Sequence, residues 1–286
     1  MNGFLMPQLF APYVVSLLKK SSDGWFICGG SLISDEHVVT AAHCVIDDDG
    51  QGMPPANISI GYGSPDKDKQ KSVNTTKVTI HPDYTINKKD RNSTYDIAIL
   101  QIPKVTFNSN TQRIPIYAGD IEPNQSLMAT GWGGTEANAI MKNILRGVIV
   151  ITGNDTDCKK LNSEFESSNG PQVCTLAKLT PGHSTCGGDS GTSVVINLDN
   201  IEMLAGLDSI AVYADGGDCG VATSGHFYIH PYYHIDFIVS STGLTESYLT
   251  DEDDEKVAKD VESADEHSVV MVTETVLEMP SNLPQY

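Results

Sequence analysis

The sequence lacks the features that would place the protein in a membrane or on a nucleic acid. No run of 18 or more apolar residues occurs, so no membrane-spanning helix is predicted. Basic residues are scarce: 18 Lys and Arg stand against 37 Asp and Glu, which gives a formal net charge of −19. Because nucleic acids and anionic membranes attract basic surfaces, neither is expected as a partner.

Cysteine motifs for metal binding and redox chemistry are also absent. The six cysteines include no Cys-x-x-Cys pair, which argues against a zinc site or a thioredoxin-type motif, and no metal or cofactor is expected. An even number of widely spread cysteines suits disulfides in an oxidising compartment, although spacing alone leaves their pairing open. Secretion and glycosylation are supported by five Asn-x-Ser/Thr sequons, at Asn57, Asn74, Asn92, Asn124 and Asn154.

Short β-type runs separated by turn residues recur between residues 12 and 238. Many short strands with Gly, Pro, Asn and Asp between them predict an all-β sandwich or barrel. Helical signals are few: they occur at residues 41–45 and 232–240, and a short helix is possible around 251–264. From Thr242 to Tyr286 there are 12 acidic residues and 2 lysines, a balance of −10 that leaves −9 for the first 241 residues. This acidic segment is too polar to bury a core, so we expect it to be mostly disordered.

A serine in a glycine-rich segment is the first candidate for chemistry. Residues 184–191 read Ser-Thr-Cys-Gly-Gly-Asp-Ser-Gly. A serine hydroxyl is a useful nucleophile only when a base takes its proton and nearby donors stabilise the resulting oxyanion. Glycines beside the serine allow the backbone to direct two N–H groups at one point. Ser190 is therefore a candidate nucleophile, and the alternative is a glycine-rich turn with an incidental serine.

Two further motifs supply the groups that such a serine needs. Residues 40–44 read Thr-Ala-Ala-His-Cys, and His43 would serve as a general base near neutral pH. Asp96 precedes the apolar run Ile-Ala-Ile-Leu, and a carboxylate at the edge of a core needs a partner such as His43. The alternatives are a structural histidine beside a cysteine and an aspartate that caps a turn.

Together these motifs, in the order His, Asp, Ser, resemble the chymotrypsin/trypsin family of serine proteases. The resemblance covers about residues 2–241, with further matches at residues 12–17, 28–33, 80–84, 131–133 and 233–238. It implies a protease domain at residues 1–241, built from two six-stranded antiparallel Greek-key β-barrels at about 12–115 and 120–231. A short closing helix at about 232–240 and a disordered acidic tail at 242–286 complete the expected fold.

The resemblance also implies roles for individual residues. His43, Asp96 and Ser190 would form the catalytic triad of a serine endopeptidase that acts through an acyl-enzyme. The N–H groups of Gly188 and Ser190 would form the oxyanion hole. The implied disulfides are Cys28–Cys44, Cys158–Cys174 and Cys186–Cys219.

By the same resemblance, a pocket for the substrate side chain has Ser184 at its base, beside Thr185. No carboxylate stands there, so a preference for Arg or Lys is not expected. Gly225 matches one wall. For the other wall, residues 209–211 and 212–214 are both possible registers, and we prefer the first because Ser209 could also bond Asp96. With Ala211 in place of the usual glycine, we expect a small-to-medium apolar pocket, chymotrypsin- or elastase-like. The adjoining insertion carries three aspartates that could enter it, Asp208, Asp215 and Asp218.

The main alternative is a non-catalytic protease homologue that binds or inhibits a partner, although none of the three triad residues is substituted. A third possibility, an acidic scaffold that acts through its tail, rests on composition alone. For the protease, we expect protein or peptide substrates, protein inhibitors as further partners, a monomeric state and secretion.

The N-terminus departs from the family pattern. Family members are generally made as zymogens and cut before an Ile-Val sequence, whose new ammonium group pairs with the aspartate before the catalytic serine, here Asp189. Met1 stands where the Val is expected, and residues 1–7 do not form a secretory leader. We therefore expect that the sequence lacks its leader, its propeptide and the Ile, and that the chain as given is weakly active.

Overall fold

The computed structural model describes residues 3–7, 9–21, 24–47, 49–85, 94–134, 143–213, 219 and 221–252. Two units are distinguished: Met1–Thr250 and Asp251–Tyr286, and only the first two residues of the second are described. Most of the predicted acidic tail, the sequon at Asn92 and the aspartates at 215 and 218 therefore lie outside the described residues. Over the described ranges, no helix is long and apolar enough to cross a membrane.

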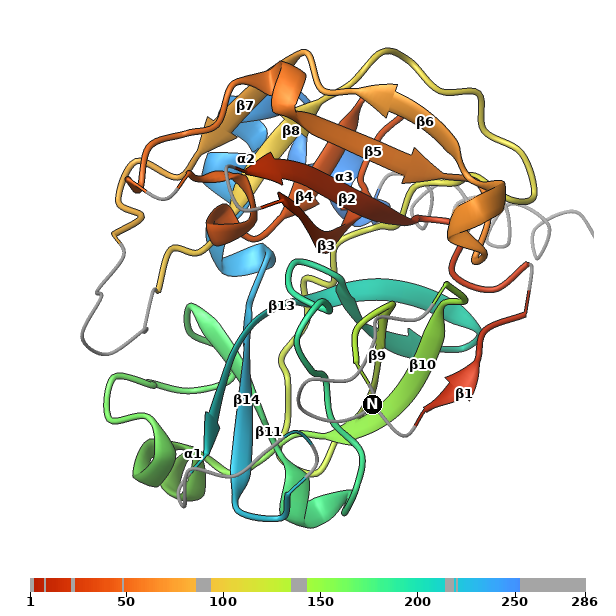
Figure 1. The fold of residues 1–286 in the computed structure, drawn as a ribbon. Helices are drawn as coiled ribbons and strands as arrows, with labels where there is room; N and C mark the ends of the chain where they lie inside the picture. Colours follow the sequence, from red (N-terminus) through yellow and green to blue (C-terminus); the bar gives the residue numbers. More distant parts are fainter. Residues whose placement is uncertain are drawn as a thin grey trace, which may run out of the picture. The chain divides into compact units, whose positions relative to one another are not determined.

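The first sheet is antiparallel and has seven strands, in the order β6-β5-β2-β3-β4-β8-β7 (Figure 1). The strands are β2 (Val14–Ser21), β3 (Gly24–Leu32), β4 (His37–Thr40), β5 (Ile58–Tyr62), β6 (Lys71–Asn74), β7 (Lys77–Ile80) and β8 (Ala98–Gln101). Alternate residues of a strand face opposite sides. In β8, Ala98 and Leu100 pack into the core of this sheet. Ile99, and Ile97 just before the strand, face the other way and pack into a cluster that also includes residues of the second sheet. The apolar run after Asp96 is therefore explained by burial on both faces.

This sheet closes on itself through Thr75 and Thr76. The Thr75 N–H donates to Ile58 O at 3.1 Å, and the Thr76 N–H donates to Gln101 O at 2.7 Å. The segment between β6 and β7 thus links strands β5 and β8. Seven strands are found where six were expected because this crossing divides one continuous segment into β6 and β7.

The second sheet is also antiparallel, in the order β1-β10-β9-β12-β13-β14-β11. The strands are β1 (Phe4–Leu5), β9 (Ser126–Gly131), β10 (Arg146–Ile151), β11 (Gln172–Leu176), β12 (Ser193–Leu198), β13 (Ile201–Tyr213) and β14 (Ser224–Ile229). A bridge between Thr152 and Thr175 joins the end of β10 to β11, so the strands from β9 to β14 also curl towards closure. The additional strand is β1, which pairs with β10 (Figure 1). Two curled antiparallel sheets confirm the predicted all-β architecture.

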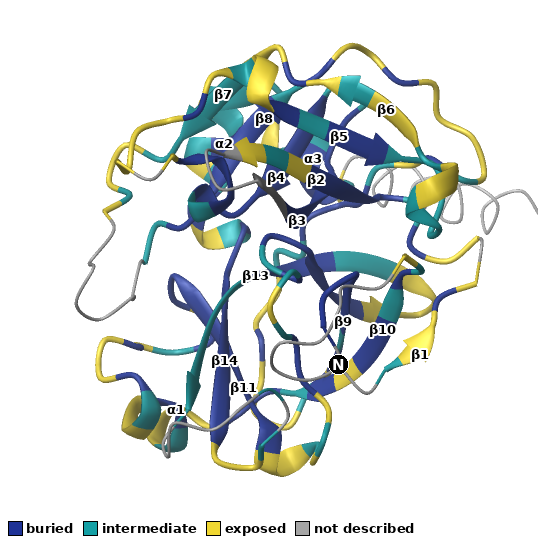
Figure 2. Ribbon diagram, viewed as in Figure 1, coloured by how far each residue is buried: buried dark blue, intermediate teal, exposed yellow. Residues whose placement is uncertain are grey.

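The buried residues form separate cores inside the sheets and a larger cluster that draws on both (Figure 2). The larger cluster includes Val39 and Ile99 of the first sheet, Leu207 and Ile229 of the second, and Leu249 near the end of the compact unit. Apolar burial of this kind is the main favourable term in folding. Packing between the sheets is therefore as much a part of the core as packing within them.

Helices are short. Those described are α1 (Asp155–Leu161), α2 (Ile235–Thr242) and α3 (Glu246–Thr250), with 3₁₀ helices η1 (Ala42–Val45), η2 (Pro55–Asn57), η3 (Lys67–Lys69), η4 (Ala177–Leu179) and η5 (Tyr232–His234). Helix α2 is capped at its C-terminal end by Gly243, whose φ of 74° is the left-handed conformation that favours glycine. Ile238 of α2 and Leu249 of α3 are 0% and 1% exposed. The first unit thus continues to Thr250, beyond the boundary expected at residue 241.

Three disulfides are present: Cys28–Cys44, Cys158–Cys174 and Cys186–Cys219. These are the three pairs that the family resemblance implied. The first joins β3 to η1, the second joins α1 to β11, and the third joins the segment before Ser190 to residue 219. A disulfide of this kind typically contributes about 2–4 kcal/mol to stability. The sequon asparagines within the described ranges, Asn57, Asn74, Asn124 and Asn154, are exposed.

Candidate active site

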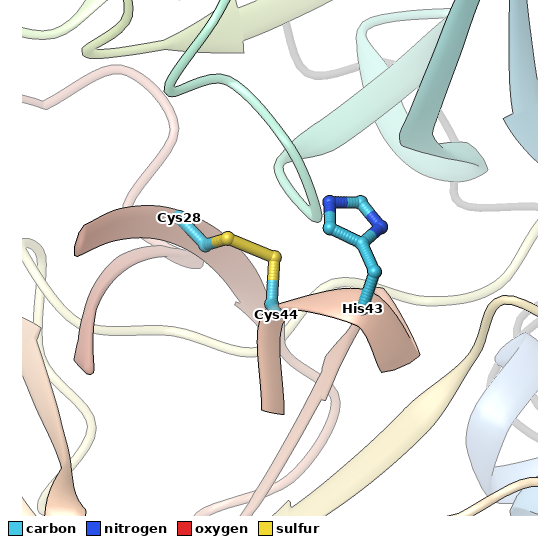
Figure 3. A group of neighbouring side chains, drawn as sticks. All are labelled: Cys28, His43 and Cys44. Carbon is cyan, nitrogen blue, oxygen red and sulfur yellow. A yellow bond between two sulfur atoms is a disulfide. The ribbon is translucent and has the colours of Figure 1, made fainter. Parts of the chain in front are cut away.

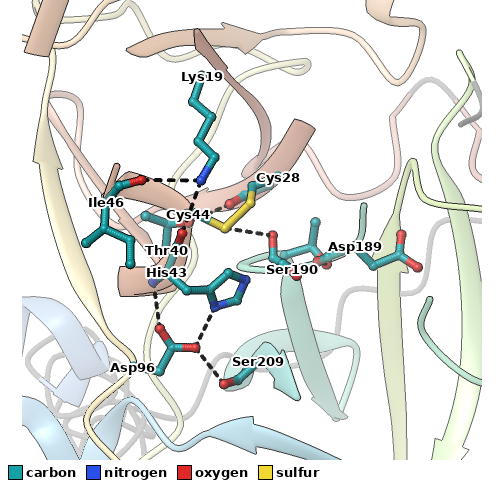
Figure 4. Close-up of a disulfide and its surroundings, with 12 residues drawn as sticks. Lys19, Cys28, Thr40, His43, Cys44, Ile46, Asp96, Asp189, Ser190 and Ser209 are labelled. Atoms are coloured by element: carbon teal, nitrogen blue, oxygen red, sulfur yellow. Dashed lines mark hydrogen bonds and ion pairs between the residues drawn. A yellow bond between two sulfur atoms is a disulfide. The ribbon is translucent and has the colours of Figure 1, made fainter. Parts of the chain in front are cut away.

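His43 lies in η1, directly after the buried strand β4, and the neighbouring Cys44 is tied to β3 by its disulfide with Cys28 (Figure 4). The backbone of His43 is held on both sides. Its N–H donates to Asp96 Oδ1 at 2.8 Å, and its carbonyl accepts from Lys19 Nζ at 3.3 Å. A third of the side chain, 34%, remains exposed. The imidazole is therefore fixed in position and still accessible to a substrate.

The imidazole of His43 is oriented by a buried carboxylate. Its Nδ1 lies 2.7 Å from Oδ2 of Asp96, which is 2% exposed, and the same oxygen accepts from Ser209 Oγ at 2.6 Å (Figure 4). Burial alone raises the pKa of Asp96, but the charge of His43 and the hydrogen bonds from His43 and Ser209 outweigh burial and lower it. Burial alone lowers the pKa of His43, but the charge of Asp96 and their hydrogen bond outweigh burial and raise it. The pair thus favours an ionised carboxylate beside an imidazole of increased basicity.

The loop that carries Ser190 is anchored to both sheets. Ser190 O accepts from the N–H of Gly29 in β3 at 2.8 Å, and the Gly191 N–H donates to the carbonyl of Asp208 in β13 at 2.7 Å. Gly191 has a φ of +75°, and a Cβ there would lie 2.6 Å from Gly29 O, so only glycine fits. These bonds hold the partly exposed Ser190 near His43 and Cys44 (Figure 4). No hydrogen bond joins Ser190 Oγ to His43 in this described part of the chain, and such bonds are often loose without substrate.

The backbone before Ser190 combines a glycine with a positive φ and two N–H groups of interest, those of Gly188 and Ser190. Gly188 has a φ of +95°, which lies in the region that glycine adopts without strain. Within the described residues, the N–H groups of Gly188 and Ser190 have no protein acceptor. Two free backbone donors beside a serine can stabilise negative charge that develops on a carbonyl oxygen.

Asp189, between these two donors in sequence, points away from His43 (Figure 4). It is fully buried, at 0% exposure, and accepts from the N–H groups of Gly133 and Cys186, each at 2.8 Å. Burial and the charge of Asp208 raise the pKa of Asp189 to about 8, against the opposing effects of the two N–H donors and of the N-terminal charge. No Lys, Arg or His of the described ranges forms an ion pair with it. The expected partner, an N-terminal ammonium group, lies outside the described residues.

The residues predicted for the substrate pocket are only partly brought together. Ser184 is 1% exposed, and its Oγ has no hydrogen-bond partner among the described residues. The expected bond from Ser209 to Asp96 is present, in keeping with the preferred register of 209–211. Gly225, however, faces the opposite side of β14, because a Cβ there would lie 2.6 Å from Leu161 Cδ1.

His226 and Asp208 lie on the side of the β13–β14 pair where Gly225 was expected. His226, the next residue of β14, has its Nδ1 3.1 Å from Thr185 Oγ1, which in turn donates to Asp208 Oδ1 at 2.8 Å. The sequence had marked Asp208 as able to enter the pocket, but His226 was missed. Sides alternate along a strand, so the side that His226 faces follows from the register of β14 against β13, which no local sequence signal indicates.

Among the residues that the structure describes, one group of side chains has the types and spacing that could suit a metal ion, but it does not support a metal site. Cys28, His43 and Cys44 have their potential ligand atoms within 4.8 Å of one another (Figure 3). Both cysteines are in the same disulfide, so neither can provide the thiolate that a metal ion would bind.

Two curled antiparallel sheets, with a His–Asp pair from the first beside a serine loop from the second, define a protein of the trypsin-type serine protease class. Comparison with known proteins agrees: the family model described as Trypsin matches residues 5–232. The chain belongs to the trypsin family.

Several members of this family are similar in sequence. Serine protease Hayan of Drosophila melanogaster is 30% identical over 231 residues, which cover 75% of this chain and 34% of that protein. Venom serine protease 34 of Apis mellifera is 28% identical over 235 residues, covering 79% and 54%. Trypsin 5G1 of Aedes aegypti is 30% identical over 197 residues, covering 68% and 70%. The chain thus spans 34% and 54% of the length of the first two relatives.

Proposed function

We propose that the protein is an active serine endopeptidase in which His43, Asp96 and Ser190 form the catalytic triad. The observation that carries this proposal is the network in which Asp96 accepts from His43 Nδ1, the His43 N–H and Ser209 Oγ. With Nδ1 engaged, the other ring nitrogen, Nε2, is left to accept a proton from Ser190.

The reaction follows from these positions. Ser190 Oγ attacks the carbonyl carbon of the scissile bond while His43 Nε2 takes its proton, and Asp96 stabilises the imidazolium that forms. The N–H groups of Gly188 and Ser190 stabilise the negative oxygen of the tetrahedral intermediate. His43 then returns the proton to the leaving amine, and water hydrolyses the acyl-enzyme by the same steps.

We propose a chymotrypsin- or elastase-like preference for small-to-medium apolar side chains before the scissile bond. Ser184, at the expected base of the pocket, offers no charge to Arg or Lys. Secretion, glycosylation at exposed sequons and synthesis as a zymogen controlled by Asp189 are parts of the same proposal. Protein substrates, protein inhibitors as partners and a monomeric state complete it.

A fluorophosphonate probe, which reacts with activated serines, tests the triad. We expect labelling and peptide hydrolysis by the native protein, and a loss of turnover of about 10⁴-fold or more in Ser190→Ala and in His43→Ala. Ser240→Ala, which removes an exposed hydroxyl from α2, is the matched control and should label like the native protein.

A non-catalytic homologue is the second candidate, and one observation favours it. Within the described residues, Ser190 Oγ makes no hydrogen bond to His43. Absence of probe labelling in the native protein, with the fold intact by circular dichroism, would support this candidate. Near-normal amide hydrolysis by Ser190→Ala would contradict the assignment of the nucleophile.

A further inference from the structure

Strands β13 and β14 form one side of the region beside the triad, and their two faces differ in character. Ala211 of β13 lies opposite His226 of β14, and Val212 lies opposite Gly225. Val212 packs against an apolar cluster that includes Leu176 and Phe227, the same side that Gly225 faces. Directly opposed residues of an antiparallel pair share a face. Ala211 and His226 therefore share the other face.

On that face, the imidazole of His226 is held by a chain of hydrogen bonds. Thr185 Oγ1 donates to the carboxylate of Asp208, so its lone pairs are available to the Nδ1–H of His226 at 3.1 Å. Nε2 lies 3.4 Å from Ser224 Oγ. Burial lowers the pKa of His226 to about 4, so the ring is neutral at pH 7 and suited to this arrangement.

The members of this chain come from three separate segments and are almost fully buried. Thr185 lies on the loop that carries Ser190, Asp208 belongs to β13, and His226 belongs to β14; they are 2%, 6% and 1% exposed. If the imidazole moved aside, its hydrogen bond to Thr185 would break and the buried Nδ1–H of His226 would lose its acceptor. The free energy of leaving a buried donor unpaired disfavours this motion. The ring is thus a fixed part of the wall.

Under the proposed function, the segments that carry Thr185, Asp208 and His226 line the pocket that receives the substrate side chain. Thr185 and Ser190 lie on one loop, and Ser209, next to Asp208, contacts Asp96 of the proposed triad. When Ser190 attacks the carbonyl of the scissile bond, the side chain of the substrate residue that carries this carbonyl would enter between this loop and the face of β13 and β14 that carries Ala211. The His226–Thr185 bond crosses between these two walls.

We propose that His226, held by Thr185 and Asp208, closes the floor of the substrate pocket and restricts cleavage to bonds after small side chains such as Ala and Ser. This inference rests on the proposed protease function and narrows it: of the two preferences, it selects the elastase-like one. Large apolar side chains such as Phe would meet the imidazole. Long basic side chains would meet it too, before they reach the carboxylate of Asp208, which already accepts from Thr185.

The test measures kcat/KM for two peptide substrates that differ only in Ala or Phe before the scissile bond. Enzyme concentration is taken from fluorophosphonate titration, so that partial activation or misfolding does not enter the ratio. We expect the native protein to prefer Ala and His226→Ala to shift the Phe/Ala ratio towards Phe by about tenfold or more. His230→Ala is the matched control, because His230 is a buried histidine whose Nδ1 bonds Gly170 O instead of a pocket residue. It should keep the native ratio.

Each outcome is decisive. A native protein that cleaves after Phe as well as after Ala, or an unchanged ratio in His226→Ala, would overturn the inference. A native profile dominated by Arg or Lys would also overturn it, and would indicate that Asp208 receives the substrate. If His226→Ala does not fold, His226→Gln and His226→Asn are measured by the same ratio, and the shorter Asn should admit Phe better. No labelling and no hydrolysis of any peptide by the native protein would instead contradict the proposed function.

Discussion

Replacing Asp189 by Asn should remove a large part of the pH dependence of stability. The folded-state pKa of Asp189 is raised to about 8 from an ordinary value of 3.8. Between these values the folded protein retains a proton that the unfolded chain has released, so stability falls as pH rises. The slope is about 1.4 kcal/mol per pH unit for one such group.

The interval between pH 6.5 and pH 8 is the most useful one. His43, whose pKa is raised, acts there in the same sense as Asp189, but it is present in both proteins and cancels from the difference between them. Below this interval, Asp208, whose pKa is raised to about 6, acts in the same sense as Asp189. His226 and His234, whose pKa values are lowered to about 4, act in the opposite sense below their ordinary value of 6.5. From pH 6.5 to pH 8 the contribution of Asp189 alone amounts to about 2 kcal/mol of lost stability.

Urea denaturation of the native protein and of Asp189→Asn, at intervals of half a pH unit, measures this difference in slope. The amide of Asn cannot accept from both Gly133 and Cys186 through equivalent oxygens, so the variant loses about 1–3 kcal/mol at every pH. That loss is independent of pH and does not affect the slope. Asp236→Asn, at an exposed position of α2, serves as the control for removal of one negative charge.

Equal slopes for the native protein and Asp189→Asn would refute the reasoning. That result would mean that a cation pairs with Asp189 in solution and keeps it ionised. An N-terminal ammonium group supplied by cleavage would act in this way, so the same experiment on a proteolytically processed sample would identify it.

Two further predictions concern the triad and the C-terminal boundary. Ser209→Ala removes one of the hydrogen bonds to Asp96, and we expect kcat to fall about tenfold, measured by steady-state kinetics on a peptide amide. Truncation after Gly243 removes Leu249, which is 1% exposed, and should lower the melting temperature by about 5 °C or more, whereas truncation after Glu252 should leave it nearly unchanged. Equal melting temperatures for the two truncated forms would contradict the packing of α3.

The short β-type runs that the sequence predicted include residues 37–40 and 97–101. They correspond closely to β4 and β8, whose residues are almost all buried on both faces of the sheet. Strand β14 lies in the stretch expected to form strands but has a weak local signal. Ser224, Gly225 and His226 are not typical strand residues, and their pairing with β11 and β13 makes them a strand.

Other differences have different physical origins. Helix α1 was not predicted, although its signals are in the sequence: Asn154 is its N-cap, Asp155 and Asp157 lie in its first turn and two lysines lie in its last. The two-residue strand β1 depends wholly on pairing with β10, and no local pattern could indicate it. For the site, the motifs placed His43, Asp96 and Ser190, because each has its own local sequence. The orientation of Gly225 and His226 depends on strand register, which the sequence alone leaves open.

The anchoring of the Ser190 loop to both sheets has a consequence for how loss of activity should be interpreted. Under the proposed function, His43 in η1 and Asp96 before β8 come from the half built on the first sheet. Ser190, on the loop before β12, and Ser209, in β13, come from the half built on the second. Catalysis is then a property of the contact between two folded halves, and neither half contains a working centre of its own. A perturbation that loosens this contact would abolish hydrolysis while the hydrogen-bonded strands of each half persist. Enzymatic activity would therefore report the docking of the two halves, and backbone spectroscopy would report their separate integrity.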